Sequence, residues 1–296
     1  MVSRGAIALA VMLSVSGCAQ RGARGAPKAW PAADWIVDGR TGERVLFAQM
    51  IDELATADVV FVGEDHHNPH HHEAQRRIIE ALSARKPDLA IGMEMLQTDA
   101  QPIADRWVAG ELDLDGFIAA TNWERTWGFP IALYRPILEL AQTKRTPIIA
   151  LNAPDRMVKR LREAGIEGLT AEERTALPEM DLKNDAHRDW VREAMGAHHA
   201  MKADRFERAY SIQVLWDESM AESVVRAKRP MVVIAGTGHL IRRMGIPARV
   251  ERREKSLKTR VVLALPVLAN TPKEIRASVK AHDADWLWIT PDEEHP

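Results

Sequence analysis

The stretch VVFVGEDHHNPHHHEAQRRIIEAL, Val59 to Leu82, decides the fold. Its first four residues are β-branched or aromatic without polar alternation, which is typical of a strand buried on both faces in a parallel sheet. Gly63 ends this run, and a polar turn follows. Asn68 is a good helix N-cap and Pro69 suits the first helical position. The stretch therefore predicts a strand, a loop and a helix of an open α/β sheet, in which ligands bind at the carboxyl ends of the strands.

Later apolar runs predict further strands of the same sheet. The second, third and fourth core strands are expected at residues 89–96, 147–151 and 230–235, and another at residues 260–267. A long helical stretch, residues 155–229, separates the third strand from the fourth and exceeds an ordinary crossover. We therefore expect an α/β fold with a mostly parallel central sheet flanked by helices. A helical cap is expected as an insertion before the fourth core strand.

Shorter elements surround these strands. Residues 35–47 predict a short strand and a turn, followed by a helix that ends near Leu54. Residues 285–290 predict an edge strand, and Pro136 is expected to open a helix that runs to Gln142. Two more helices are predicted over residues 97–108 and 112–120, with an aromatic loop over residues 123–130.

Length and composition indicate a globular protein. The chain has 296 residues, of which 46% are hydrophobic and 28% are charged, so it can bury a substantial core. Its formal net charge is -2 and its basic residues are dispersed. We expect no nucleic-acid partner, because proteins that bind nucleic acid concentrate positive charge on one face.

The N-terminus carries a predicted lipoprotein signal. Arg4 supplies a positive charge, and the apolar residues 6–15 are too few to span a bilayer. Cys18 is the only cysteine, which rules out an internal disulfide, and its place after Val-Ser-Gly resembles a bacterial lipobox. We predict removal of the signal peptide, residues 1–17, and acylation of Cys18, for example by palmitate. The alternative is an ordinary secretory signal that contains a cysteine.

The segment after the lipidation site predicts a tether. Residues 18–34 are rich in Gly, Ala, Pro and Arg and lack an apolar period, which is typical of a flexible linker. Ala19 and Gln20 lack the aspartate that retains many lipoproteins at the inner membrane. We expect a lipid anchor in the bacterial cell envelope, at the outer membrane of a Gram-negative cell. The α/β domain is expected over residues 35–296.

Four predicted strands end on polar groups, which are Glu64 to His67, Glu94, Asn152 and His239. In a parallel sheet these four ends lie at one edge. Two histidines with one or two carboxylates form a ligand set for a divalent transition metal, so Glu64, His67 and His239 are candidate metal ligands. The alternative is a group of solvated loop residues without a shared role.

The helix after Asn68 adds one candidate. Its apolar stripe includes Ala74, which places His70 and His71 on the inner side, whereas His72 is expected to face outward. Three consecutive histidines of a helix cannot all face one site. His71 is therefore the candidate ligand-binding residue of this run.

A second helix, within Met201 to Lys228, carries a polar patch in the middle of an apolar face. Spacings of three and four place Tyr210, Gln213 and Asp217 together on this face, and we expect them to meet the polar edge of the sheet. The alternative is a core helix whose polar groups are hydrogen-bonded locally. The loop before it adds two histidines that are expected over the same cleft, His198 and His199.

Together these motifs resemble the ChaN-like family of haem-binding lipoproteins, from Val59 to Pro247. The resemblance lies in VGEDHHNPHHHEAQ, GMEML, LYRPILELA followed by IIALNAP, the Ala-His-His loop, QVLWDESMA and AGTGHLIRRMGIP, in this order. It implies haem binding, in at least one member as a cofacial pair at a homodimer interface with tyrosine on iron, and a role in iron or haem uptake or handling. Tyr210, or else Tyr134 or a histidine, is the implied axial ligand, with Arg or His groups on the propionates. The wider haem-site prediction also includes His71, His198, His199, Gln213 and Asp217.

The same core is similar to a wider group that includes the erythromycin esterases and the Tiki/TraB metalloproteases. The shared elements are a Gly-Glu-x-x-His loop, here Gly63, Glu64 and His67, and a later Gly-x-x-His, here Gly236 and His239. This similarity implies an alternative function, a hydrolase of the esterase or peptidase type that activates water with a metal or a Glu-His pair. Its catalytic residues would be Glu64, His67, Glu94 and His239. A binding scaffold with a degenerate site is a third reading.

Overall fold

The structure, a computed structural model, describes residues 35–196, 202–267 and 271–291. The predicted signal peptide, Cys18, the tether, His198 and His199 lie outside the described residues. Within the described part of the chain, no helix has the length and apolar character needed to cross a membrane.

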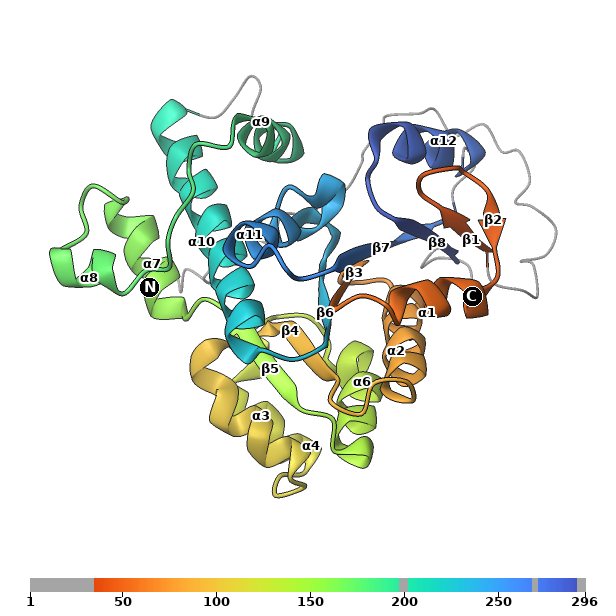
Figure 1. Cartoon of the computed structure of the whole chain (residues 1–296). Helices are drawn as coiled ribbons and strands as arrows, with labels where there is room; N and C mark the ends of the chain where they lie inside the picture. The colour runs from red at the N-terminus through yellow and green to blue at the C-terminus, as the bar shows by residue number, and fades with distance from the viewer. Residues whose placement is uncertain (1–34, 197–201, 268–270, 292–296) are drawn as a thin grey trace, which may run out of the picture.

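One sheet of eight strands organises the described residues, in the order β2-β1-β8-β7-β3-β6-β4-β5 (Figure 1). The strands from β8 to β5 in this order are mutually parallel, whereas β1 pairs antiparallel with both β2 and β8. The mostly parallel α/β fold is therefore confirmed. The strands are β1 (Trp35–Asp38), β2 (Arg44–Val45), β3 (Val59–Glu64), β4 (Ala90–Gln97), β5 (Ile148–Asn152), β6 (Met231–Gly236), β7 (Thr259–Pro266) and β8 (Trp286–Thr290).

Helices cover both faces of this sheet (Figure 1). The longer helices of the first half are α1 (Phe47–Leu54), α2 (Pro69–Ser83), α3 (Gln101–Val108), α4 (Leu114–Thr121) and α6 (Ile131–Lys144). Those of the second half are α7 (Asp155–Ala164), α9 (Asp185–Ala194), α10 (Ala203–Ala227), α11 (Ile246–Arg253) and α12 (Thr271–Ala281). Shorter turns of helix are α5 (Trp123–Thr126), α8 (Ala171–Thr175), η1 (Thr98–Ala100), η2 (Thr237–His239) and η3 (Ile241–Arg243).

The side chains of β3 point alternately to the two faces of the sheet, and each face has its own hydrophobic core. Val60 and Val62 pack with α2 and α6 on one face, whereas Val59 and Phe61 pack with α10 and α11 on the other. All four side chains are at most 2% exposed, and burial of each such side chain stabilises the fold by roughly 1.5–3 kcal/mol. A strand that is apolar on both sides therefore belongs in the middle of the sheet, where β3 lies.

Four predicted details differ from the structure. Strand β8 is not an edge strand, because β1 pairs with its outer side. Helix α6 begins at Ile131 and contains Pro136, which therefore does not open it. The predicted aromatic loop contains the helical turn α5. His72 does not face outward but is 3% exposed.

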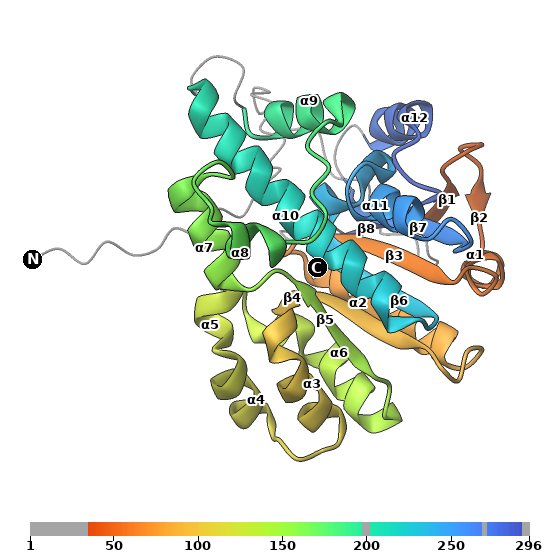
Figure 2. The same cartoon turned by 60° about the vertical axis from the view of Figure 1, so that its left-hand side comes forward.

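The stretch between β5 and β6 is helical, as predicted, but its description as a cap is not confirmed. Met220 and Val224, in the C-terminal half of α10, pack against the strands, so this half of the helix covers a sheet face. The N-terminal half of α10 extends beyond the sheet together with α7 and α9 (Figure 2). The midpoint of α10 therefore lies next to the carboxyl ends of the strands.

Candidate functional site at the carboxyl edge of the sheet

The carboxyl ends of three neighbouring strands bring buried polar side chains together. Glu64 ends β3 and is paired in register with Gly236 at the end of β6. Glu94 lies near the end of β4, the other neighbour of β6, and His239 follows β6 in η2. The predicted convergence of strand ends is confirmed. The fourth predicted member, Asn152 of β5, donates a hydrogen bond from its side chain to the Glu94 carbonyl at 3.1 Å.

Glu64 is the acceptor at the centre of the first half of the site. Its carboxylate lies 2.7 Å from His66 Nδ1 and accepts hydrogen bonds from the Tyr134 hydroxyl at 2.6 Å and the Gln75 amide at 2.7 Å. His72 Nδ1 lies 3.3 Å from the other carboxylate oxygen. Burial opposes ionisation, but His72 and His66 outweigh it and hold the pKa of Glu64 well below its usual range. Glu64 is therefore a buried, charged acceptor.

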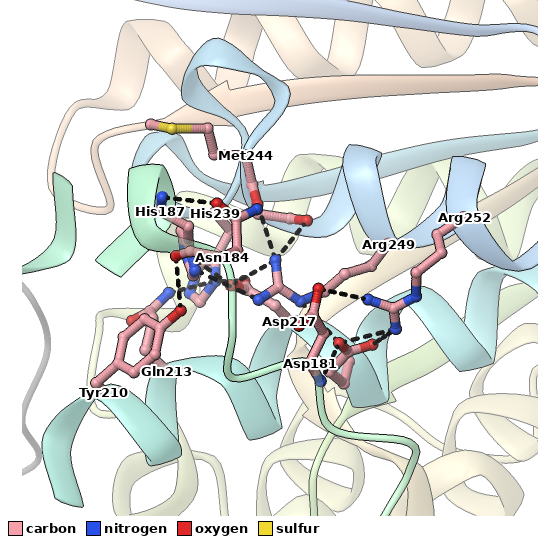
Figure 3. A network of polar contacts seen from close by, with 12 residues as sticks. Asp181, Asn184, His187, Tyr210, Gln213, Asp217, His239, Met244, Arg249 and Arg252 are labelled. Atoms are coloured by element: carbon pink, nitrogen blue, oxygen red, sulfur yellow. Dashed lines mark hydrogen bonds and ion pairs between the residues drawn. The ribbon is translucent and has the colours of Figure 1, made fainter. Parts of the chain in front are cut away.

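Glu94, His239 and Asp217 form the second half. Glu94 accepts a hydrogen bond from the Gly236 amide at 2.6 Å, and its other oxygen lies 3.2 Å from His239 Nε2. His239 Nδ1 lies 2.6 Å from Asp217 Oδ1 (Figure 3). Burial alone would lower the pKa of His239, but the two carboxylates raise it to about 10. His239 is thus an imidazolium held between two carboxylates at neutral pH.

A neutral histidine, His187, and a cation, Arg249, lie beside Asp217 on the helical side of the site (Figure 3). His187 Nε2 lies 3.3 Å from Asp217 Oδ2, and Arg249 lies 3.7 Å from the same oxygen. Burial lowers the pKa of His187 to about 4, so it is neutral near pH 7. Arg249 also donates to the Met244 and Gly245 carbonyls at 2.8 and 3.0 Å. The site is therefore fixed to α9, α10 and α11 by a continuous polar network.

The predicted histidines of the β3–α2 loop lie in different places. His67 is exposed, and its ring contacts Phe129 with centroids 4.8 Å apart. His66, which the sequence analysis did not select, contacts Glu64 instead. His71 is buried and accepts a hydrogen bond from the Asp65 amide at 2.8 Å, so it stabilises the loop. No periodicity of the sequence identifies His66, because it lies in a turn after the end of β3.

The predicted residues of α10 divide into two groups. Gln213 and Asp217 meet the sheet edge, where the Gln213 amide nitrogen lies 3.0 Å from His239 Nδ1. Tyr210 does not reach this edge, because its ring packs with Phe206 and its hydroxyl donates to the Asn184 carbonyl at 3.3 Å. The second tyrosine, Tyr134 of α6, is buried, and its hydroxyl donates a hydrogen bond to Glu64.

The acids and histidines do not form a metal site in the described residues. No group of three or more His, Cys, Asp or Glu side chains is arranged there to hold a metal ion. His67 is exposed, whereas the acids and histidines that contact one another, Glu64, Glu94 and His239, are buried. The metal-dependent alternative is therefore not supported by the part of the chain described.

The fold and this buried edge define an α/β protein with a candidate ligand site at its strand ends. Residues 50–250 match the family model described as haem-binding uptake, Tiki superfamily, ChaN. The chain therefore belongs to this family, and the predicted resemblance is confirmed. No curated protein matches the sequence.

One solved structure shares the fold, and others are more distantly similar. One is described as cofacial haem binding to ChaN of Campylobacter jejuni, with a TM-score of 0.72 and 20% identity over 88% of this chain and 98% of that chain. An erythromycin esterase mutant in its open conformation has a TM-score of 0.46 and 11% identity, covering 88% and 82% of the two chains. RRSP, a MARTX toxin effector domain from Vibrio vulnificus, has a TM-score of 0.41 and 18% identity over 73% and 35%.

A haem ligand needs an atom that a porphyrin can reach, and the tyrosines do not offer one. Tyr134 and Tyr210 are both 0% exposed, and both hydroxyls already donate hydrogen bonds. Burial raises the pKa of Tyr210 to about 12, and burial with the charge of Glu64 raises that of Tyr134 well above its usual range. Both tyrosine hydroxyls are therefore inaccessible from the surface in this structure, and the ligation of haem by either tyrosine stays a prediction.

Two surface pockets in the described part of the chain can be compared with a haem in size. A pocket of about 290 Å³ lies beneath residues 179–183 and Arg252. A second, of about 110 Å³, lies between α2 and α6 beside His72. The smaller is well below the usual size of a pocket for such a ligand, and no tyrosine lines either one.

Proposed function

We propose that this protein binds haem and serves in haem or iron uptake at the bacterial cell envelope. The observation that carries the proposal is the match of residues 50–250 to the haem-binding uptake family. The similar Campylobacter jejuni structure is described as cofacial haem binding, which supports a homodimer with a haem pair at its interface. The carboxyl edge of the sheet is the proposed site, because ligands bind there in open α/β folds.

The test is a titration of the full-length protein, purified in detergent, with ferric haemin. We expect a saturable change in the Soret absorbance with about one haem per chain, in the affinity range of a specific ligand site. Iron-free protoporphyrin is the matched control, because it presents the same ring without a metal to ligate. A linear, unsaturated response that the two porphyrins share would contradict haem binding.

The envelope location rests on the N-terminal sequence. The apolar segment followed by the single cysteine Cys18 supports lipid anchoring, and the absence of aspartate after it supports the outer membrane. Cys18→Ser should release the protein from the membrane fraction in a cell fractionation. Retention of this variant in the membrane to the same extent as the wild type would contradict the anchor.

The buried acid–histidine pairs favour a second candidate, a hydrolase that uses Glu94, His239 and Glu64. A histidine held between two carboxylates, 3.2 and 2.6 Å away, can orient or protonate a reacting group. Since His239 is charged at neutral pH, it would act as an acid or as an electrostatic stabiliser. Haem storage alone does not require this arrangement.

Hydrolysis is tested with ester, lactone and peptide substrates on wild-type protein and on His239→Asn. Activity that the variant loses while it keeps its circular dichroism spectrum would support the hydrolase. Elemental analysis of protein purified without added metal tests the metal-dependent form. Absence of both a stoichiometric metal and any cleavage rejects the candidate.

A further inference from the structure

The first residue of β1 lies at the same edge of the sheet as the candidate site. Strand β1 runs antiparallel to β8, and Trp35 pairs with Ile289 near the carboxyl end of β8. The parallel registers place Gly63 level with Leu263, and Leu263 level with Leu287. Trp35 therefore enters the sheet two residues beyond the level of Gly63, on the carboxyl side.

The chain also enters the sheet close to the site in the direction across the strands. Three strand spacings separate β1 from β3, and four separate it from β6. At about 4.8 Å per spacing, the start of β1 lies roughly 15–20 Å from the strand ends that carry Glu64 and precede His239. The segment before Trp35 therefore joins the domain beside the candidate site and not at the opposite, amino edge of the sheet.

This segment is short compared with the height of the sheet. Sixteen residues, 19–34, separate the predicted lipidation site Cys18 from Trp35. A random coil of this length has a root-mean-square end-to-end distance of roughly 20–24 Å. The eight residues of β4 alone extend for about 26 Å from the amino to the carboxyl edge. With the amino edge on the membrane, the segment would have to stretch past this height and the loops as well.

The composition of the segment favours contact with a membrane. It contains three basic residues and one acid, which are Arg21, Arg24, Lys28 and Asp34. Basic residues next to a lipid anchor are attracted to anionic headgroups, and Trp30 is of a type enriched at membrane interfaces. Both features bring the start of β1, and with it the carboxyl edge, toward the bilayer.

The carboxyl edge itself presents aromatic side chains beside the site. Trp127 and Phe129 belong to the connection between α5 and α6 and are only partly buried. Their rings contact His66, with centroids 4.8 and 4.7 Å apart, and His66 contacts Glu64. Partly exposed aromatic side chains are favourable at the headgroup region of a bilayer.

We propose that in the haem-free protein the carboxyl edge of the sheet faces the lipid bilayer, and that the candidate site takes haem from the membrane surface. Haem is a flat, largely apolar ring with two carboxylates, so it leaves water for the headgroup boundary of a membrane. A short tether at the edge of the site holds the site where this ligand concentrates. This inference rests on the proposed haem binding and lipid anchor, and it adds the source of the ligand and the orientation of the domain.

The orientation is measured on the acylated full-length protein without haem, in vesicles of phosphatidylethanolamine and phosphatidylglycerol. Asp99→Cys and Asp88→Cys form a matched pair, because both positions are exposed and they flank the two ends of β4. Acylation occupies Cys18, the only native cysteine, so each variant offers one free thiol for a fluorophore. A quencher attached to the lipid headgroups then reports which edge approaches the bilayer.

We expect strong quenching of the fluorophore in Asp99→Cys and little in Asp88→Cys. Stronger quenching in Asp88→Cys, equal quenching in both variants or none in either overturns the proposed orientation, whatever the haem affinity of the protein.

The source of the ligand is tested with vesicles that are preloaded with ferric haemin. The initial rate of the Soret change is compared between the wild type and a variant in which a Gly-Ser insertion after Ala33 doubles the length of the segment. Effective concentration falls as the −3/2 power of tether length, so transfer should slow by about three-fold in the variant. The affinity of this variant for haemin in solution is the control and should be unchanged.

The possible failures have separate readouts. Equal transfer rates in the wild type, the insertion variant and Cys18→Ser overturn the membrane source, while haem binding stands. Retention of Cys18→Ser in the membrane fraction removes the anchor and the orientation with it. The absence of saturable haemin binding in solution removes the proposed function itself.

Discussion

Asp217 is, after Glu94, the second buried carboxylate that raises the pKa of His239 and keeps it charged. Its side chain is fully buried and faces His239 at 2.6 Å, His187 at 3.3 Å and Arg249 at 3.7 Å. Removing one partner from a buried ion pair leaves an uncompensated charge, which typically costs 3–5 kcal/mol. Loss of the Asp217 charge should therefore destabilise the folded protein.

We predict that Asp217→Asn lowers the free energy of unfolding by about 3–5 kcal/mol near pH 6. The measurement is urea unfolding followed by circular dichroism. Asp52→Asn is the matched control, because Asp52 pairs with Arg85 at the surface and such pairs contribute about 0–1 kcal/mol. An equal loss in both variants would show that the buried network adds nothing.

The same substitution should change the pH dependence of stability. In the folded protein the pKa of His239 is about 10, above its ordinary value of 6.5. Its stabilising contribution is therefore complete below pH 6.5 and is lost as the pH rises toward 10. In Asp217→Asn one of the two carboxylates is gone, so the pKa should fall and the loss between pH 6.5 and 10 should become smaller.

At the residue scale, the sequence predicted which types of residue come together at the candidate site, but not every residue that does so. Glu64, Glu94, Gln213, Asp217 and His239 follow from strand ends and helix spacing. We predicted His67 at the site, but His66 is the histidine that contacts Glu64. The conformation of the turn after β3 decides between these two neighbours, and no periodicity of the sequence specifies it. The depth of Tyr210 depends on its contact with Phe206 and the loop at Asn184, which is tertiary information.

At the scale of elements, the start of α2 sets the loop that carries His66 and His67. The Asn68 side chain accepts a hydrogen bond from the His70 amide at 2.9 Å and donates one to the Pro291 carbonyl at 3.2 Å. It is 2% exposed. This one residue both caps the helix and attaches it to the end of β8.

We predict that Asn68→Ala destabilises the protein by about 1 kcal/mol through loss of the cap, with a further cost for the unpaired Pro291 carbonyl. Asn68→Ser is the comparison, because serine retains an acceptor for the helix amide and should recover part of the loss. Thermal unfolding of both variants measures the difference. Equal destabilisation by Ala and Ser would show that the cap hydrogen bond has no role.

The errors made for elements have a common cause. Strand β8 lies inside the sheet because the early hairpin β1–β2 returns to pair with it, a long-range contact that local pattern does not contain. Helix α6 begins at Ile131, so Pro136 lies inside the helix and not at its first position. The spacing of apolar residues predicted that the chain between β5 and β6 is helical. It did not predict that Met220 and Val224 pack on the sheet.

At the scale of the whole molecule, the parallel order β7-β3-β6-β4-β5 makes one edge chemically distinct. Glu64 ends β3, Glu94 lies in the C-terminal half of β4, and His239 follows β6. Helix α10 adds Asp217 to these side chains. The fold class followed from unbroken apolar strands alone. The strand order could not, because every core strand has nearly the same composition.

A haem bound at the carboxyl ends of the strands with one face on the protein would turn its other face toward solvent. Exposure of an apolar porphyrin face is unfavourable, and a second copy of the chain with its own haem can cover it by stacking the two rings. We predict that haemin loading shifts the protein from monomer to dimer, with dimer affinity raised by about 5- to 150-fold, the usual range of such coupling. Sedimentation of apo and loaded protein across a concentration series measures this, and iron-free protoporphyrin serves as the control. A loaded protein that remains monomeric, or an apo dimer of equal affinity, would show that haem and assembly are independent in this chain.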